Sequence, residues 1–345
     1  MAQLLLTLVI KNPNEEFTRY MGSGKMKLPK LYTIFRPDIQ LIEKELRSAI
    51  QVDAKQLQEA SVHTLKAGGK RIRPVFVLLT AKFGHYDISQ IKYAAVALEL
   101  IHSASLVHDD IIDEAELRRG SLTVRSKWDN KVATYTGDYI FARAQELMTY
   151  IEEPLAHKVL AKTIMEVSIG EIEQIKDKYN FNQNLRNYLR RIKRKTAYLI
   201  AASCQLGAIS AGVSEEIHKK LFLYGYYVGM SFQIMDDVLD FTATEKELGK
   251  PAGSDLWQGN ITLPVLYAME NPSINKVIRT VHEDMSHDEL KPILQEIKSS
   301  GAIEKSISLS NTYLDKALNI LNELPDSKNK QYLIDIARFI GKRKY

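Results

Sequence analysis

Two acidic clusters with the same spacing, DDIID at residues 109–113 and DDVLD at 236–240, are the strongest chemical feature of this sequence. Each cluster ends an apolar run with helical spacing, and residues four apart lie on the same face of a helix. The first and last aspartates of each cluster therefore point the same way. Carboxylates that converge on a cavity repel one another unless cations compensate them. Mg²⁺ is the hard cation that bridges carboxylates to phosphates, so the clusters predict a magnesium site.

The alternative interpretation is that both clusters are acidic helix ends at the surface. Aspartate is unfavourable near the C-terminus of a helix because the helix dipole is negative there. Two such placements, each directly after an apolar helix, would have to coincide. The metal site is therefore the preferred interpretation.

Basic residues accompany the acidic clusters at three places. The sequence GGKRIRP at residues 68–74 combines a glycine turn, cations and a proline near the start of a helix, as phosphate sites often do. Arg118-Arg119-Gly120 follows the first acidic cluster, and Lys195-Thr196 precedes another apolar helix. Each feature alone is weak evidence, since turns with solvated charges are common. Together, metal ligands that alternate with cations suit a reaction between two diphosphates.

The elements that position these residues are predicted to be helices. Apolar residues recur with helical spacing over long segments, which short breakers separate, and the period-two stretches typical of strands are short. We therefore predict an all-α fold, a single domain of roughly ten or more helices, over residues 27–345. Segments 94–106 and 197–211 are apolar almost all round and are expected inside the bundle.

Composition and charge narrow the class of protein. The 345 residues include 45% hydrophobic and 26% charged residues, which is ordinary for a globular protein. The net charge of +5 includes a basic cluster at residues 186–195. We interpret this cluster as a solvated helix face, with an anionic ligand or a membrane surface as alternatives. No nucleic-acid partner is expected, because no aromatic-rich or zinc motif accompanies the charge. No transmembrane segment is expected, because no apolar run is long enough.

The single cysteine, Cys204, lies in an apolar run and can form no internal disulfide. We predict that it is buried as a small hydrophobic residue, and that the protein is cytoplasmic. Residues 1–26 lack the charged start and cleavage site of a signal peptide, and we expect them to be a flexible tail or the result of a misplaced start. The candidate start residues are Met1, Met21 and Met26.

Seven motifs, in order and spacing, resemble the trans-polyprenyl diphosphate synthase family of farnesyl, geranylgeranyl and longer-chain synthases. They are GGKRIRP, HSASLVHDDIIDEAELRRG, GDY, GEIEQ, KTA, FQIMDDVLD and GKPAGSD, and the resemblance covers nearly all of residues 27–345. It implies the isoprenoid synthase type of helical fold around a central cavity. It also implies Mg²⁺-dependent, head-to-tail condensation of isopentenyl diphosphate with an allylic diphosphate. LRRG, MSFQIMDD, SDLWQGNITLP and the C-terminal GKRKY are most similar to the large component of the two-component heptaprenyl or hexaprenyl synthases of Gram-positive bacteria.

The resemblance assigns roles to residues whose motifs match. The ligands of Mg²⁺, roughly three ions per active site, would be Asp109, Asp113, Asp236 and Asp240, with Asp110 and Asp237 behind them. The diphosphate of isopentenyl diphosphate would be bound by Lys70, Arg73, His102 and Arg119. The allylic diphosphate would be bound by Lys250 and by the catalytic residues Arg118, Lys195, Thr196 and Gln233. Asn260 stands where many family members have lysine, which removes one cation from that site.

The resemblance also implies a product and partners. The expected starter is farnesyl diphosphate, and the expected product is heptaprenyl diphosphate (C35) for the side chain of menaquinone, with hexaprenyl diphosphate (C30) or another length as the alternative. A small, non-homologous regulatory subunit (component I), a homodimer, or both are expected, as is transient membrane association through the product.

Three other functions stay open. A terpene cyclase shares the helices but carries an Asn/Ser/Glu metal motif in place of the second DDxxD. A head-to-head condensing synthase has different acidic spacing. A non-catalytic partner subunit of a prenyl synthase heteromer would have no reason to keep both acidic clusters.

Product length is predicted from the residues that precede the first acidic cluster. A growing isoprenoid chain would run along the helix that ends at Asp109, past Ala104 and Ser105 and then past Ile101 and Leu98. In short-chain family members, bulky aromatic residues four or five positions before the first aspartate close this tunnel. Here both positions are small, which implies a product longer than C20.

Overall fold

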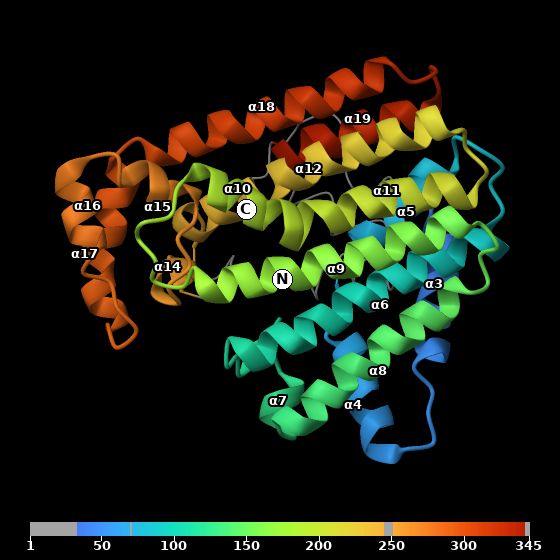
Figure 1. Ribbon diagram of the computed structural model, residues 1–345, viewed down its shortest axis with the longest axis horizontal. Coiled ribbons are helices and arrows are strands. Elements are labelled where there is room, and N and C mark those ends of the chain that lie inside the picture. Colours follow the sequence, from blue (N-terminus) through green and yellow to red (C-terminus); the bar gives the residue numbers. More distant parts are fainter. Residues whose placement is uncertain (1–32, 70, 245–250, 342–345) are drawn as a thin grey trace, which may run out of the picture. The chain divides into compact units, whose positions relative to one another are not determined.

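The computed structural model describes residues 33–69, 71–244 and 251–341, and nearly all of its regular structure is helical (Figure 1). The helices are α3 (Arg36–Ala49), α4 (Lys55–Lys66), α5 (Ile72–Ala81), α6 (Ile88–Ile112), α7 (Val124–Lys127), α8 (Asn130–Met148), α9 (Pro154–Lys176), α10 (Leu185–Ile192), the π-helical turn η2 (Lys193–Ala197), α11 (Tyr198–Ser210), α12 (Glu215–Thr242), α14 (Ser254–Trp257), α15 (Leu263–Ala268), α16 (Pro272–Ile278), α17 (His287–Ser299), α18 (Ala302–Asn322) and α19 (Lys328–Gly341). The prediction of an all-α fold is confirmed.

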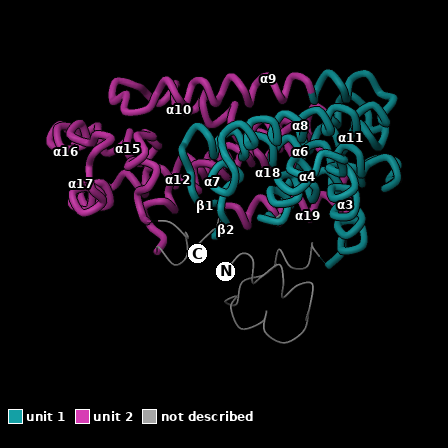
Figure 2. The backbone as a smooth tube through the Cα atoms, turned by 90° about the horizontal axis from the view of Figure 1, so that it is seen from below, with its two compact units in different colours: residues 1–160, 203–218 teal, residues 161–202, 219–345 magenta. Residues whose placement is uncertain are grey.

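The chain forms two compact units, which Figure 2 distinguishes by colour. The described part of the first unit covers residues 33–69, 71–160 and 203–218, and that of the second covers 161–202, 219–244 and 251–341. The boundaries fall inside α9, α11 and α12. One domain over residues 27–345 stays a prediction, and residues 1–26, with the three candidate starts, lie outside the described residues.

In the first unit, α6 is the central element. It packs along α8 and also contacts α5 and α3. Its N-terminus is capped by the Asp87 side chain, which accepts a hydrogen bond from the Ser89 backbone N–H, and almost every residue from Ala94 to Ile101 is buried. The prediction that segment 94–106 lies inside is therefore confirmed for this helix. Because α6 is fixed on several sides, the acidic residues at its C-terminal end have a rigid base.

The second unit builds its core from α12, α14, α15, α17 and the start of α18. The N-terminus of α17 carries a capping box, in which Ser286 and Glu289 satisfy each other's backbone N–H groups. Helix α18 packs on α15 and on α19. The part of α12 that carries residues 236–240 contributes Met235, Val238 and Phe241 to this core, so its acidic residues also stand on a buried helix.

Cys204 is buried, as predicted, and burial raises the pKa of its thiol. Among the described helices, none is both long and apolar enough to cross a membrane.

Candidate active site

The first acidic cluster ends α6. Asp109 and Asp110 are buried, and Asp113 is the C-cap residue of the helix. The Asp110 carboxylate accepts a hydrogen bond from Nε of Arg118 at 2.5 Å. Burial raises the pKa of Asp110, and Arg118 partly offsets the rise. Asp110 therefore holds Arg118 in place, and its position behind the metal ligands stays a prediction.

Arg118 and Arg119 lie on a two-stranded hairpin that the sequence did not predict. Strand β1 (Leu117–Arg118) pairs antiparallel with β2 (Ser121–Leu122), and the two turn residues, Arg119 and Gly120, have φ values of 54° and 76°. Two left-handed residues are typical of the tight hairpin turn that usually has asparagine or aspartate before glycine. An arginine in this position is strained, and such strain persists where a functional arrangement is held in place.

The glycine turn of GGKRIRP makes room for the hairpin. A Cβ atom at Gly69 would lie 2.9 Å from Nη1 of Arg119, so the guanidinium group packs directly against this glycine. Lys70, predicted to bind isopentenyl diphosphate, lies outside the described residues. Gly69 and Arg119, fifty residues apart in the sequence, thus meet at one surface.

Arg71, which the sequence reasoning left without a role, is a structural residue. It precedes α5 with φ of 45°, is buried, and donates to Glu43 at 2.5 Å and to Glu99 at 2.9 Å. Burial lowers the pKa of its guanidinium, but Glu99 and Glu43 outweigh this, and the net direction is upward. Arg71 therefore ties α3, α5 and α6 together.

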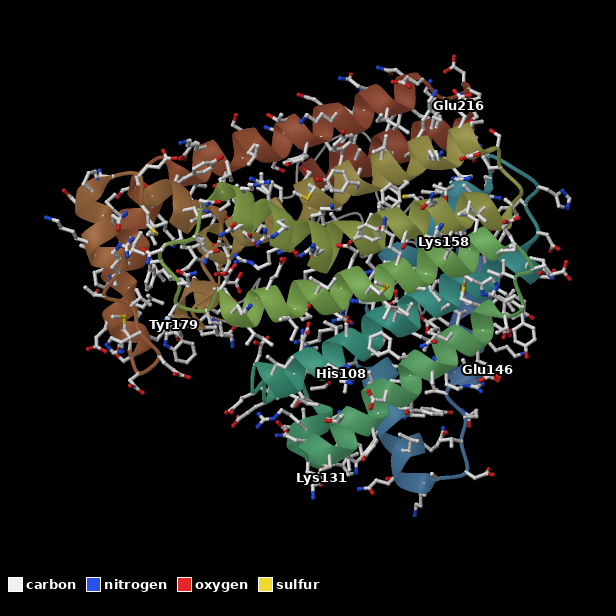
Figure 3. All side chains as sticks on the ribbon, viewed as in Figure 1. His108, Lys131, Glu146, Lys158, Tyr179 and Glu216 are labelled. Carbon is white, nitrogen blue, oxygen red and sulfur yellow. The ribbon has the colours of Figure 1, made fainter. Side chains whose placement is uncertain are left out.

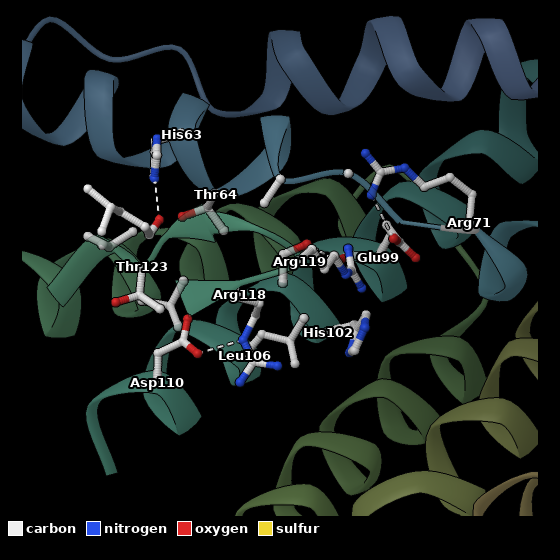
Figure 4. A pocket seen from close by; sticks show the side chains of 16 residues that line it. His63, Thr64, Arg71, Glu99, His102, Leu106, Asp110, Arg118, Arg119 and Thr123 are labelled. Atoms are coloured by element: carbon white, nitrogen blue, oxygen red, sulfur yellow. Dashed lines mark hydrogen bonds and ion pairs between the residues drawn. The ribbon is translucent and has the colours of Figure 1, made fainter. Parts of the chain in front are cut away.

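These residues line one pocket of the first unit (Figure 4). Arg118 and Arg119 come from the hairpin, His102 and Asp110 from α6, and Figure 4 shows the basic groups turned toward a common space. Arg73 lies close enough to interact electrostatically with both Glu99 and Arg119. The pKa of Arg73 is lowered to about 10, mainly by burial; Glu99 opposes this change and Arg119 contributes to it. The pocket is thus a cluster of cations with few carboxylates, which suits a diphosphate.

We expect His102 to make the stability of the protein fall below pH 6.5. Burial lowers its pKa well below the ordinary value of 6.5, and Arg73 and Arg119 add to this. The folded protein keeps His102 neutral, whereas the unfolded chain binds a proton there. The unfolded state is therefore stabilised relative to the folded state as pH falls below about 6.5. The free energy of unfolding, measured by urea denaturation from pH 7.5 to 5, should decline less steeply for His102→Gln than for wild type. The exposed His282 supplies the control, since His282→Gln should keep the wild-type slope. Equal slopes for His102→Gln and wild type would contradict this.

His108, beside the acidic cluster, points from α6 toward α8 (Figure 3). Its ring lies 3.3 Å from the Asp138 carboxylate and packs near Phe141. A Cβ atom at Gly137 would lie 2.3 Å from His108 Nε2, so the GDY motif supplies the space for this ring. His108 is therefore a helix-packing residue.

The second acidic cluster lies on α12 in the second unit. Asp237 is buried and accepts hydrogen bonds from the Tyr188 hydroxyl at 2.6 Å and from Gln233 Nε2 at 2.8 Å. The pKa of Asp237 is raised to about 7, mainly by burial and also by nearby Asp255, while the hydrogen bonds from Tyr188 and Gln233 oppose the rise. The Gln233 side-chain carbonyl in turn accepts from the Thr196 hydroxyl at 2.7 Å. Two residues predicted to bind the allylic diphosphate are thus joined, and Asp237 sets the orientation of the Gln233 amide.

Lys195 and Thr196 lie in the π-helical turn η2, a feature often found at functional sites. Two glycines allow close approach to this turn. A Cβ at Gly170 of α9 would lie 3.0 Å from the Lys195 backbone N, and one at Gly229 of α12 would lie 2.5 Å from Ala197 Cα. Lys195 Nζ donates to Glu171 at 2.8 Å. The GEIEQ motif therefore supplies both the small residue and the carboxylate that position Lys195.

The basic cluster at residues 186–195 differs from the predicted solvated face. Arg191 is buried and donates to Gln183 and to the Ile261 carbonyl at 2.8 and 2.6 Å. Arg194 pairs with Glu166 and Glu173 of α9. Both arginines connect segments that lie far apart in the sequence, and we therefore interpret them as structural residues.

Asp240 differs from Asp236 in its surroundings. Asp236 is half-buried, whereas Asp240 is buried and accepts hydrogen bonds from Ser254 Oγ at 3.0 Å and from the Asp255 N–H at 3.2 Å. The Asp240 carboxylate therefore anchors the start of α14. Asn260 follows this helix, where its N–H donates to the Asp255 carbonyl. Lys250 lies outside the described residues.

Among the described residues, no group of three or more acidic, histidine or cysteine side chains is gathered closely enough to hold a metal ion by itself. Mg²⁺ commonly takes one or two carboxylates, several waters and substrate phosphates. Asp110 lines the cation-rich pocket of the first unit, and Asp109 precedes it on α6, a placement that fits that mode of binding.

The predicted chain-length residues lie on α6. Ile101 and Ala104 are completely buried, and Ser105 is half-buried, with its hydroxyl donating to the His102 carbonyl at 2.9 Å.

Other residues of these networks also had no predicted role, among them Glu99, Glu171 and Tyr188. Glu99 was signalled by being the only charge in the apolar run AAVALELIHSAS, and Glu171 by its place in GEIEQ.

The chain is similar to known proteins over most of its length. The polyprenyl synthetase family pattern matches residues 54–297. The chain is 58% identical over 336 residues to heptaprenyl diphosphate synthase component 2 of Bacillus subtilis, covering 97% of this chain and 96% of the relative. The crystal structure of heptaprenyl diphosphate synthase from Staphylococcus aureus matches with a TM-score of 0.85 and 44% identity, over 90% of this chain and 98% of that one. A polyprenyl synthase from Caulobacter crescentus, complexed with calcium and isoprenyl diphosphate, matches with a TM-score of 0.88 and 30% identity, over 94% of this chain and 100% of that one. The chain therefore belongs to the polyprenyl synthetase family.

Proposed function

We propose that this protein is a trans-prenyltransferase that adds isopentenyl diphosphate units head-to-tail to an allylic diphosphate, with farnesyl diphosphate as the starter. The product is an all-trans polyprenyl diphosphate, heptaprenyl diphosphate (C35), which serves as the precursor of a menaquinone side chain. The observation that carries the proposal is the cation-rich pocket next to the first acidic cluster, in a chain 58% identical to a heptaprenyl diphosphate synthase component.

The pocket of the first unit binds the diphosphate of isopentenyl diphosphate. Its lining includes His102 and Arg119, the charge of Arg73 lies near Arg119, and Lys70 completes the proposed set. Because His102 stays neutral, it contributes an N–H donor and not a charge. The strained turn and Gly69 fix the Arg119 guanidinium before the substrate arrives, which reduces the entropy cost of binding.

The allylic diphosphate is bound by Arg118, Lys195, Thr196, Gln233 and Lys250. Asp109, Asp113, Asp236 and Asp240 hold about three Mg²⁺ ions. When bound, these ions neutralise the charge that develops on the leaving diphosphate. Gln233 keeps one amide N–H for the substrate, since the other is committed to Asp237. Arg118 and Lys195 supply fixed positive charge for the same purpose.

The bonding changes follow from this arrangement. The C–O bond of the allylic diphosphate breaks, and its electron pair leaves with the diphosphate. The double bond of isopentenyl diphosphate attacks the allylic carbocation, and a new C–C bond forms. The proton lost from the adjacent carbon passes to the departing diphosphate. Apolar helices such as α6 keep water from the cation.

The test is an assay of the purified chain with Mg²⁺, farnesyl diphosphate and labelled isopentenyl diphosphate, with product length measured by chromatography. A C35 product supports the proposal, and a C30 product or another length supports the alternative chain length. Absence of condensation in the presence of a cellular extract would support the non-catalytic subunit.

We also propose that the chain works in an assembly, with a small regulatory subunit of unrelated sequence, as a homodimer, or both. The similar Bacillus subtilis protein is called component 2. An apolar stripe on α9 supports this: Met165 and Ile172 are 62% and 59% exposed, and Ile169 and Ile175 lie beside them. A continuous apolar helix face exposed to water is typical of an interaction surface.

Replacing Ile172 with aspartate is expected to weaken this association at least about tenfold, because a charge would be buried in an apolar contact. The fold should persist, since the side chain is exposed. Analytical ultracentrifugation of the chain alone, and synthesis of long-chain product with and without extract, measure the two associations. Leu223→Asp, on α12 and 40% exposed, is the matched control and should behave like wild type. If Ile172→Asp changed neither the mass of the assembly nor the stimulation of product synthesis by the extract, the stripe would not be an interface. Full C35 synthesis by the isolated monomer would overturn the assembly itself.

A further inference from the structure

Glu99 is an unexpected residue for an anion-binding pocket. It lies in the middle of α6, three residues before His102, and is only 3% exposed. A buried carboxylate is costly unless it is paired, and here it would also repel a diphosphate. Its presence among the pocket residues (Figure 4) therefore calls for a physical reason.

The contacts of Glu99 supply one. Its Oε1 accepts from Arg71 Nη1 at 2.9 Å, while its Oε2 is buried and has no hydrogen-bond partner among the described residues. Nε of Arg73 is likewise buried, and no described residue forms a hydrogen bond with it. Glu99 also attracts Arg119, whose pKa is lowered by burial. One carboxylate thus stands among three guanidinium groups, with acceptor capacity left over.

Three guanidinium groups at close quarters repel one another, and a fixed opposite charge removes this repulsion before any substrate arrives. Among the described residues, three carboxylates act on these groups: Glu43, Glu99 and Asp110, and Asp110 pairs with Arg118 and attracts Arg119 but not Arg73. Glu43 contacts Arg71 alone and is 27% exposed. Glu99 is buried, and it is the carboxylate whose attraction opposes the lowering of the Arg73 and Arg119 pKa values. Glu99 is thus the common counter-charge.

We propose that Glu99 is a positioning residue for the isopentenyl diphosphate site, where it holds Arg73 and Arg119 in the arrangement that receives the diphosphate. It acts through these arginines and does not touch the substrate. Arg71 then locks Glu99 into place, so the two arginines of the KRIR segment have different tasks. The proposal deepens the proposed function and rests on it.

The test compares two neutral, nearly isosteric variants. Glu99→Gln should raise KM for isopentenyl diphosphate by about ten- to a hundredfold, the effect of losing a charge-assisted interaction, while kcat and KM for farnesyl diphosphate change by less than about threefold. Glu43→Gln, which removes the other partner of Arg71, should lower the melting temperature and leave both KM values within about twofold. A structural role alone predicts that both variants lower the melting temperature without a selective KM change.

Calorimetric titration of wild type and Glu99→Gln with inorganic diphosphate separates this inference from the proposed function. If wild type binds diphosphate without condensing isopentenyl diphosphate, the function fails, but tenfold weaker binding by Glu99→Gln still supports the positioning role. Equal binding by the two proteins, or equal KM increases in Glu99→Gln and Glu43→Gln, would overturn it. Should Glu99→Gln fail to fold, Glu99→Asp withdraws the carboxylate by one methylene and is expected to show the same selective rise in KM, whose absence would count against the proposal.

Discussion

Replacing Asp109 or Asp236 with alanine is expected to lower turnover by several orders of magnitude while the helical fold stays intact. Each substitution removes a predicted Mg²⁺ ligand, whose charge compensation acts most strongly when the leaving group departs. Asp109 is buried beside another carboxylate, so its loss should relieve repulsion and slightly stabilise the metal-free protein. Turnover at several Mg²⁺ concentrations, circular dichroism and the melting temperature measure these effects.

Asp240 supplies a matched comparison within the same motif. Its carboxylate accepts hydrogen bonds from Ser254 and from the Asp255 N–H, so Asp240→Ala should leave buried donors unpaired and lower the melting temperature. Asp236→Ala should not. Asp240 is also a proposed Mg²⁺ ligand, so Asp240→Ala should lose both activity and stability, whereas Asp236→Ala should lose activity alone. Near-normal activity of both Asp109→Ala and Asp236→Ala at low Mg²⁺ would refute the metal assignment.

The helical class and the position of the acidic clusters could be predicted because both depend on local pattern. An apolar run such as residues 94–106 has one way to avoid water, which is to be buried in a helix. The clusters at its end, and at the end of the matching run before Asp236, are then fixed by helical geometry.

The hairpin of Arg118 and Arg119 could not be predicted from pattern, because its strands are two residues long and its turn uses arginine where asparagine is usual. Similarly, nothing local separates Arg71 from Arg73. Arg71 takes its structural role from Glu43 and Glu99, each 28 residues away in the sequence.

In the second unit, too, the surroundings of the site residues depend on contacts between distant parts of the sequence. Lys195 and Thr196 were found because they precede an apolar helix, but the π-helical turn that displays them depends on Gly170 and Gly229 of other helices. Arg191 looked like one more residue of a solvated face. Its burial depends on the Ile261 carbonyl, seventy residues further along the chain.

Replacing Ala104 with phenylalanine is expected to shorten the product to C15–C20. The isoprenoid tail is proposed to run from the metal site along α6, and from Asp109 to Leu98 is eleven residues, or about 16 Å at ~1.5 Å per residue. Ala104 lies one to two turns before Asp109, so a ring there would stand across the path. The acidic cluster is untouched, and the first condensations should still run. Chromatography of the products against C15, C20 and C35 standards measures the change.

The surroundings of Ala104 sharpen this test. Ala104 is completely buried, so the larger side chain also overpacks the helix interior, and a lower melting temperature is expected. Ser105 is half-buried, with its hydroxyl bound to the His102 carbonyl, and Ser105→Phe should be accommodated with less loss of stability. If the tail passes this face of α6, the double variant with both Ala104→Phe and Ser105→Phe should give the shortest product. Ile101→Val, which changes volume slightly and adds no ring, is the control and should keep the wild-type length. Wild-type length in Ala104→Phe and in the double variant would mean that the tail follows another face, even if the condensation chemistry stands.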